Sequence, residues 1–123
     1  MRLNVMGTVN MLESARKAGV DRMITASSAA VLGAGGGMHL ETDRMLPLSP
    51  YGSSKGALEL FCSSYYASYG LRTLAFRFAN VHGPYSWRKG SVVAAFCKQA
   101  LANGTLIVNG DGRQSRDLLF APD

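Results

Sequence analysis

The stretch Ser-Pro-Tyr-Gly-Ser-Ser-Lys at residues 49–55 decides how the rest of this chain is understood. A proline after a serine is typical of the first turn of a helix. In such a helix Tyr51 and Lys55, which are four residues apart, lie on one face one turn from each other. A positive charge beside a phenol favours the phenolate form, so the phenol can take up or release a proton near neutral pH. This is the chemistry that oxidation of an alcohol by hydride transfer requires.

A pair of serines lies upstream, at the end of a run typical of a short buried strand. Ser28 has two interpretations: its hydroxyl caps the turn that follows, or it shares the proton of the tyrosine. Lys55 taken alone is typical of a solvated helix surface. Because tyrosine, lysine and serine occur together, we predict that Ser28, Tyr51 and Lys55 converge and that their role is catalytic.

Helical and strand patterns alternate along the chain, which indicates an α/β architecture with a parallel sheet. Gly19, Gly70 and the pair Asn103-Gly104 are typical helix ends. Residues 33–48 are expected to form a loop. The pattern predicts helices over residues 3–18, 50–69 and 92–102, strands over residues 22–28, 73–78 and 106–108, and a turn over residues 110–112.

Four further motifs occur in the order found in one known family. The chain resembles the extended short-chain dehydrogenase/reductases, and within them the NAD-dependent nucleotide-sugar epimerases and dehydratases. Besides the tyrosine motif, four stretches are similar to the family's sequence. They are residues 4–13 (NVMGTVNMLE), residues 26–33 (ASSAAVLG), and the two substrate-side motifs, residues 77–84 (RFANVHGP) and 110–117 (GDGRQSRD).

The resemblance implies a partial Rossmann-like, doubly wound parallel sheet with flanking helices, truncated at both ends relative to the family. The family opens with a Gly-rich strand-turn-helix that holds the dinucleotide, and we expect this chain to begin after it. Residues 1–123 are then a single partial domain, a central fragment, in which the substrate-binding part begins near residues 84–123.

The resemblance also implies a role for each matching residue. Ser28, Tyr51 and Lys55 are the expected catalytic group. NAD is the expected cofactor and a nucleotide-diphosphate sugar the expected substrate. The expected cofactor-binding residues are Asn4, Ser27, Tyr51, Lys55 and Phe78, and the expected substrate-binding residues are Ser28, Asn80 and Arg116. The planar, bidentate guanidinium of Arg116 suits a phosphate.

The residues after Ser28 bear on the type of reaction. Sugar dehydratases of the family carry an Asp-Glu pair there for elimination of water, whereas this chain has Ala29 and Ala30. The resemblance therefore implies a C4 epimerase, in which Tyr51 serves both oxidation of the sugar and re-reduction of the keto-sugar on its other face. A dehydratase, decarboxylase or reductase of the same family is an alternative. So is a non-catalytic truncated remnant, or an interaction module that does not bind NAD unaided.

Two other motif matches are rejected. The glycine run at residues 33–37 follows a strand, but no predicted helix follows it, so the dinucleotide-binding fingerprint is absent from these residues. Residues 52–56 fit the Gly-x-Ser-x-Gly pattern of a hydrolase. That pattern needs a strand immediately before it, which Pro47 and Pro50 oppose.

Composition limits the classes of partner. The net charge is +5, from 13 Lys and Arg against 8 Asp and Glu, and these residues are dispersed. Dispersed positive charge suits an anionic nucleotide, while nucleic acid is not expected because no basic stripe is interleaved with aromatics. No segment long enough to span a membrane and no metal-ligand spacing occurs. We expect Cys62 and Cys97 to be buried free thiols in a cytoplasmic protein. The family's dimer implies a homo-oligomer formed through the helices at residues 3–18 and 50–69.

Overall fold

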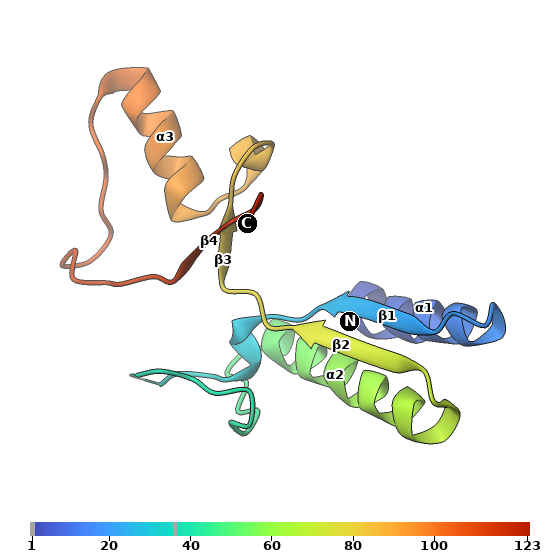
Figure 1. Ribbon diagram of the computed structural model, residues 1–123. Coiled ribbons are helices and arrows are strands. Elements are labelled where there is room, and N and C mark those ends of the chain that lie inside the picture. The colour runs from blue at the N-terminus through green and yellow to red at the C-terminus, as the bar shows by residue number, and fades with distance from the viewer. Residues whose placement is uncertain (1, 36) are drawn as a thin grey trace. The chain divides into compact units, whose positions relative to one another are not determined.

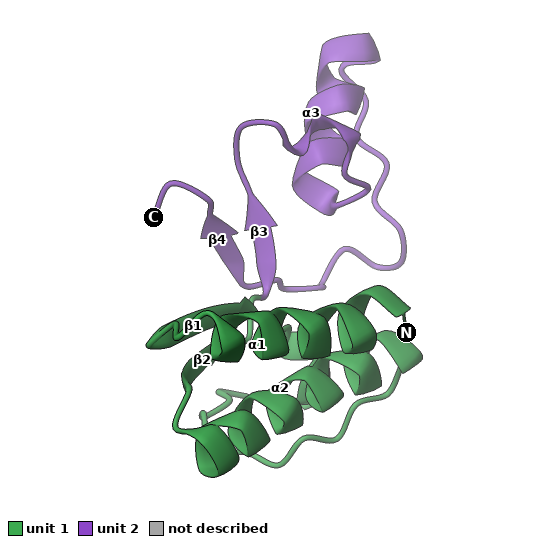
Figure 2. Ribbon diagram, turned by 90° about the vertical axis from the view of Figure 1, so that its right-hand side faces the viewer, with its two compact units in different colours: residues 1–78 green, residues 79–123 purple. Residues whose placement is uncertain are grey.

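The computed structural model describes residues 2–35 and 37–123, so Gly36, within the predicted loop, lies outside the described residues. The chain divides into two compact units, residues 1–78 and residues 79–123, which Figure 2 colours separately. Each unit is built around its own pair of parallel strands.

The first unit contains strands β1 (Arg22–Ala26) and β2 (Arg72–Phe76), which pair in parallel with Ala26 opposite Phe76. The long helix α2 (Pro50–Tyr69) lies between them in the sequence. A π-helical turn, Arg2–Met6, leads into helix α1 (Gly7–Lys17). Figures 1 and 2 show α1 and α2 side by side on one face of this sheet.

The bounds of α2 match the prediction because they depend on local signals. The Ser49 hydroxyl accepts a hydrogen bond of 3.0 Å from the Gly52 amide, which satisfies one of the free N–H groups of the first turn. Pro50 occupies the first helical turn, where a missing N–H costs nothing. Gly70 ends the helix in the left-handed conformation, with φ of 72°.

The core of the first unit joins both helices to the sheet. Leu12 of α1, Leu58 and Cys62 of α2, and Leu71 are all buried in one cluster. Full burial of a leucine side chain contributes about 1.5–3 kcal/mol, so these contacts fix α1 and α2 against the strands.

The two faces of the β1–β2 sheet differ in exposure. On the covered face, Met23 packs on the core and Thr25 is buried. On the other face Ile24, Leu74 and Phe76 are 67%, 53% and 44% exposed. The alternation follows from the period of two in a strand, with only one face covered by helices.

The second unit pairs β3 (Asn80–His82) with β4 (Leu118–Phe120) in parallel. Helix α3 (Val92–Asn103) lies between them in the sequence and ends at Gly104, which has φ of 71°. None of the helices in the described ranges has the length and apolar character that a membrane crossing requires.

Several sequence predictions need correction. Residues 106–108 do not form a strand, since no neighbouring strand pairs with them and their side chains are exposed. The strands predicted over residues 22–28 and 73–78 end two residues earlier, at Ala26 and Phe76. Both cysteines are free thiols, but only Cys62 is buried; Cys97 is exposed.

Candidate active site

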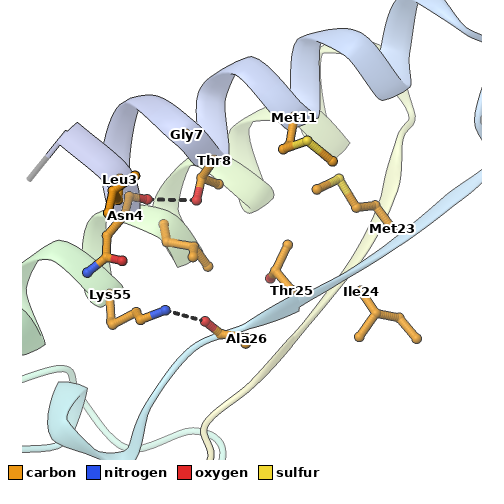
Figure 3. Close-up of a pocket in the computed structure, with 11 residues that line it drawn as sticks. Leu3, Asn4, Gly7, Thr8, Met11, Met23, Ile24, Thr25, Ala26 and Lys55 are labelled. Carbon is orange, nitrogen blue, oxygen red and sulfur yellow. Dashed lines mark hydrogen bonds between the residues drawn. The ribbon is translucent and has the colours of Figure 1, made fainter.

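Lys55 reaches from α2 to the end of the first strand. Its ammonium group donates a hydrogen bond of 2.7 Å to the carbonyl oxygen of Ala26, the last residue of β1 (Figure 3). The same nitrogen lies 6.0 Å from the centre of the Tyr51 ring, one helical turn earlier. Tyr51 is 51% exposed, so its phenol is open to a ligand. A fixed positive charge thus lies beside an accessible phenol.

Ser28 lies two residues beyond β1 and caps the short 3-10 helix Ala29–Val31. Its Oγ accepts a hydrogen bond of 3.2 Å from the Ala30 amide. A serine hydroxyl has one donor and two acceptor positions, so this cap leaves its proton free to be donated. Capping and a catalytic role are therefore compatible at this residue.

The first turn of α2 lies directly against the segment that carries Ser28. A Cβ added to Gly52 would come within 2.4 Å of the Ala30 carbonyl oxygen. Only a glycine permits this approach. The glycine beside Tyr51 therefore lets the tyrosine helix pack on the serine segment.

An open pocket of about 360 Å³ lies between α1, the end of β1 and α2, and Asn4, Ala26 and Lys55 contribute to its lining (Figure 3). The Asn4 amide donates to Ser54 Oγ at 2.9 Å, and Ser54 donates to the Tyr51 carbonyl at 2.7 Å. This chain of bonds fixes Asn4 against α2. An ammonium and an amide are chemically suited to bind ribose hydroxyls and a carboxamide. The volume of the pocket is near the lower limit for small-molecule sites.

Ser27 does not point into this pocket. It is buried, and its hydroxyl donates to Glu59 Oε1. Glu59 also accepts hydrogen bonds from Arg77, which follows β2. Burial raises the pKa of Glu59, but the hydrogen bonds from Arg77 and Ser27 outweigh burial and hold that pKa below its ordinary value. Ser27 thus belongs to a partly buried ionic cluster in this structure.

Sequence reasoning missed Glu59 and Arg77. Arg77 opens the RFANVHGP motif, and Glu59 lies one turn beyond Lys55 on the same helix. Both residues were therefore visible in or near a motif, but their separation of 18 residues in the sequence does not indicate that they pair. Phe78, predicted as a cofactor residue, accepts a hydrogen bond of 2.9 Å from the Ala29 amide through its backbone carbonyl.

Asn80 and Arg116 belong to the second unit. The Asn80 side chain donates to the Asp117 carbonyl at 3.2 Å, which joins Asn80 to the segment that carries Arg116. Arg116 is exposed, and its guanidinium donates to the Ser115 carbonyl at 2.9 Å and to Gln114 Oε1 at 3.3 Å. Parallel pairing of β3 and β4 therefore brings these two predicted substrate residues into one part of the second unit. The remaining predicted site residues lie in the first unit: Asn4, Ser27, Ser28, Tyr51, Lys55 and Phe78.

Comparisons with known proteins agree with this geometry. The sequence profile of the NAD dependent epimerase/dehydratase family matches residues 1–123. UDP-glucose 4-epimerase of Mycolicibacterium smegmatis is 37% identical over 125 residues, which cover 98% of this chain and 40% of that protein. This chain thus spans less than half the length of that relative.

Two solved structures are also similar. UDP-N-acetylglucosamine 4-epimerase from Methanobrevibacter ruminantium M1, in complex with UDP-N-acetylmuramic acid, matches with a TM-score of 0.90 and 32% identity, over 97% of this chain and 40% of that chain. dTDP-glucose 4,6-dehydratase from Bacillus anthracis, in complex with NAD, matches with a TM-score of 0.86 and 33% identity, over 95% of this chain and 38% of that chain. The fold is therefore part of a Rossmann-like sheet, and the chain belongs to the NAD-dependent epimerase/dehydratase family.

Proposed function

We propose that this chain forms the catalytic part of an NAD-dependent nucleotide-sugar 4-epimerase. The observation that carries the proposal is the position of Lys55, whose ammonium lies beside the Tyr51 ring and is bonded to the end of the strand that leads to Ser28. The packing of α2 on the serine segment at Gly52 supports it further.

Each of the three residues has a distinct role in this proposal. Tyr51 takes the proton from the sugar C4 hydroxyl and later returns it, while the Lys55 charge favours the phenolate form. Ser28 donates its free hydroxyl proton to the same sugar oxygen. NAD, when bound, supplies the hydride acceptor, and Asn4 and Lys55 are the residues of this chain that would hold its nicotinamide end.

Epimerisation is favoured over dehydration by the side chains that follow Ser28. Elimination of water needs an acid and a base besides the tyrosine, and the 3-10 helix after Ser28 offers Ala29 and Ala30. Glu59 does not replace them, because Ser27 and Arg77 bind its carboxylate and hold its pKa below the ordinary value, despite burial.

Substrate binding is assigned to the second unit. Asn80 and Arg116 are proposed to bind the diphosphate of the nucleotide sugar, since an amide and an exposed guanidinium both donate to phosphate oxygens. The similar UDP-N-acetylglucosamine 4-epimerase structure carries UDP-N-acetylmuramic acid, and the similar dTDP-glucose 4,6-dehydratase structure carries NAD. This supports a nucleotide-sugar substrate class without selecting one sugar.

The test is a product assay with the complete natural protein that contains these residues. With NAD and UDP-glucose or UDP-N-acetylglucosamine, the expected product is the C4 epimer, detected by chromatography and NMR. A 4-keto-6-deoxy sugar as the main product would replace the epimerase proposal with a dehydratase. Absence of any change in a panel of nucleotide sugars would contradict both.

We also propose a cytoplasmic location and a homo-oligomer. The free thiols of Cys62 and Cys97 are consistent with a reducing compartment. On α2, Leu58 and Cys62 are buried in the core, whereas Phe61 is 36% exposed and its neighbour Leu60 is 60% exposed. These two exposed side chains are the proposed contact with a second copy of the chain.

A further inference from the structure

A partly buried cluster joins Ser27, Glu59 and Arg77. Ser27 directly precedes Ser28 in the sequence, and Glu59 lies one helical turn beyond Lys55. Arg77 binds Glu59 through two nitrogens: Nη2 donates to Oε2 at 2.9 Å, and Nε donates to Oε1 at 3.1 Å. Ser27 Oγ donates to the same Oε1. The side chains of Arg77 and Glu59 are only 21% and 13% exposed. One carboxylate therefore joins the end of β1, the middle of α2 and the segment after β2.

This cluster completes a set of bonds on both sides of Ser28. Two residues before it, the Ala26 carbonyl accepts from Lys55; one residue before it, the Ser27 hydroxyl donates to Glu59. One residue after it, the Ala29 amide donates to the Phe78 carbonyl at 2.9 Å. Lys55 and Glu59 lie on consecutive turns of α2, the helix that carries Tyr51. The backbone at Ser28 is thus held by that helix and by the segment that follows Arg77.

Stability alone does not account for a partly buried ion pair between Arg77 and Glu59. The cost of removing two charges from water roughly cancels their attraction, so an apolar pair of similar size commonly stabilises a fold as well. Bidentate, charge-assisted bonds differ from apolar contacts in direction, because they fix the angle and distance between the groups they join. The cluster is therefore better suited to fixing the relative positions of the groups that it joins than to stabilising the fold.

The same arginine also reaches the loop between the serine segment and α2. Arg77 Nη1 donates to the Glu41 carbonyl at 3.2 Å. The Leu46 amide, further along that loop, donates to the Val31 carbonyl at 2.9 Å. The second contact joins the loop to the segment that follows Ser28, and the first joins the same loop to Arg77.

We propose that Glu59 is a positioning residue for the reaction: through Ser27 and Arg77 it holds Ser28 in register with Tyr51 of the same helix. This inference rests on the proposed epimerase function for its kinetic consequence, but its structural consequence can be measured without turnover. A misplacement of a reacting group by about 1 Å can lower a rate by roughly 100-fold.

The kinetic experiment uses Ser27→Ala and Glu59→Gln in the complete natural protein that contains residues 1–123. Ser27→Ala leaves the Arg77–Glu59 pair intact and removes only the link to the serine segment. We expect kcat to fall by about 10-fold for Ser27→Ala and about 100-fold for Glu59→Gln, with KM for the nucleotide sugar and Kd for NAD changed less than about 3-fold.

Cys62→Ala is the matched control, because Cys62 is buried on the same helix, one turn beyond Glu59, and its thiol lies 3.6 Å from the Thr25 hydroxyl, which is outside the cluster. It should lower the melting temperature without lowering kcat at a temperature where all variants are folded. A loss of kcat in Cys62→Ala equal to that in Ser27→Ala, at equal loss of melting temperature, would show a purely structural role and overturn the proposal.

A second measurement is independent of activity. Amide hydrogen exchange over residues 29–32 reports how firmly the serine segment is held, since the amides of Ala29, Val31 and Leu32 are hydrogen-bonded there. Exchange should become at least about 10-fold faster at these amides in Ser27→Ala and Glu59→Gln than in Cys62→Ala, where the segment stays fixed. Unchanged exchange in both variants would overturn the positioning role. If the wild-type protein turns over no nucleotide sugar while exchange responds as expected, the proposed function fails and the positioning of Ser28 stands.

Discussion

At the scale of single residues, the proposed chemistry depends on one phenol and its surroundings. Tyr51 is half exposed at the start of α2, with the Lys55 ammonium on one side and the serine segment against the same turn of helix. Its hydroxyl is the only phenol that the proposal uses, although other tyrosines lie along the same helix. This makes a matched pair of substitutions possible.

Tyr51→Phe should lower kcat by at least about 1000-fold in the complete natural protein, because it removes the general acid and base of the reaction. Binding of the nucleotide sugar should stay within about 3-fold, since the ring remains and only one hydroxyl is lost. Steady-state kinetics and calorimetry measure the two quantities.

Tyr66→Phe is the control for this substitution. Tyr66 lies on the same helix and is 59% exposed, so it loses an equivalent hydroxyl on an exposed surface. Its activity should equal that of the wild type. An active Tyr51→Phe variant would remove the tyrosine from the mechanism.

At the scale of elements, the close packing of α2 on the serine segment depends on Gly52. Gly52→Ala should destabilise the fold by about 1–3 kcal/mol, because its methyl group would overlap the Ala30 carbonyl oxygen at 2.4 Å. It should also lower kcat, since Tyr51 is displaced from Ser28. Thermal unfolding and kinetics measure both effects.

Gly56→Ala, one turn further along α2, is the control for Gly52→Ala and should have the opposite effect on stability. The nearest atom to its added methyl group is Met45 Sδ at 3.5 Å, an ordinary contact. Alanine is a better helix former than glycine, so this variant should be more stable than the wild type by about 0.5–1 kcal/mol. Equal effects at the two glycines would contradict the assigned packing of α2 on Ala30.

The contact between α1 and α2 carries a pH-dependent group. A hydrogen bond from Arg16, with the charges of Arg16 and Lys17 nearby, holds the pKa of Glu13 at about 2, below its ordinary value of 4.5. The Tyr65 hydroxyl of α2 also donates to Glu13, at 3.4 Å. Because the folded-state pKa is depressed, the stabilisation by Glu13 is complete above pH 4.5 and is lost as the pH falls toward 2.

Glu13→Gln therefore should lower the melting temperature near pH 6 and have no effect near pH 2. The difference between the two proteins, measured by thermal unfolding from pH 7 to pH 2, should close between about pH 4.5 and pH 2. A difference that stays constant over this range would mean that the carboxylate of Glu13 gains no partner on folding.

At the scale of the whole molecule, residues 1–123 are proposed to contribute one end of a dinucleotide site. No Gly-rich phosphate loop that leads into a helix occurs in this sequence, and that motif supplies most phosphate contacts in such folds. Isolated residues 1–123 should therefore bind NAD more weakly than about 1 mM in calorimetry. Micromolar affinity would show a further site within these residues.

Association is the second property of the whole chain. If Leu60 and Phe61 contact a second copy, sedimentation at high micromolar concentration should give a dimer or larger species, and Leu60→Lys should shift it to the monomer. Leu101→Lys is the control, because Leu101 is 77% exposed on α3 and outside the proposed contact. A wild-type monomer with cooperative unfolding would contradict the proposal.

The sequence by itself determined the features that depend on neighbours in the chain. Both ends of α2 follow from Ser49, Pro50 and Gly70, because capping and positive φ are local requirements. The place of Tyr51 beside Lys55 follows from the helical repeat. The four motifs likewise fixed the family and its parallel α/β fold.

The tertiary structure alone decided the features that need a distant partner. Residues 106–108 have the composition of a strand but remain unpaired, while Asn80–His82 becomes a strand because Leu118–Phe120 lies beside it. From the sequence, Glu59 is typical of an exposed helix residue. In the structure its carboxylate is bound by Ser27 and Arg77. Strand pairing and burial join segments tens of residues apart, and their free energy depends on which groups meet, which no local pattern contains.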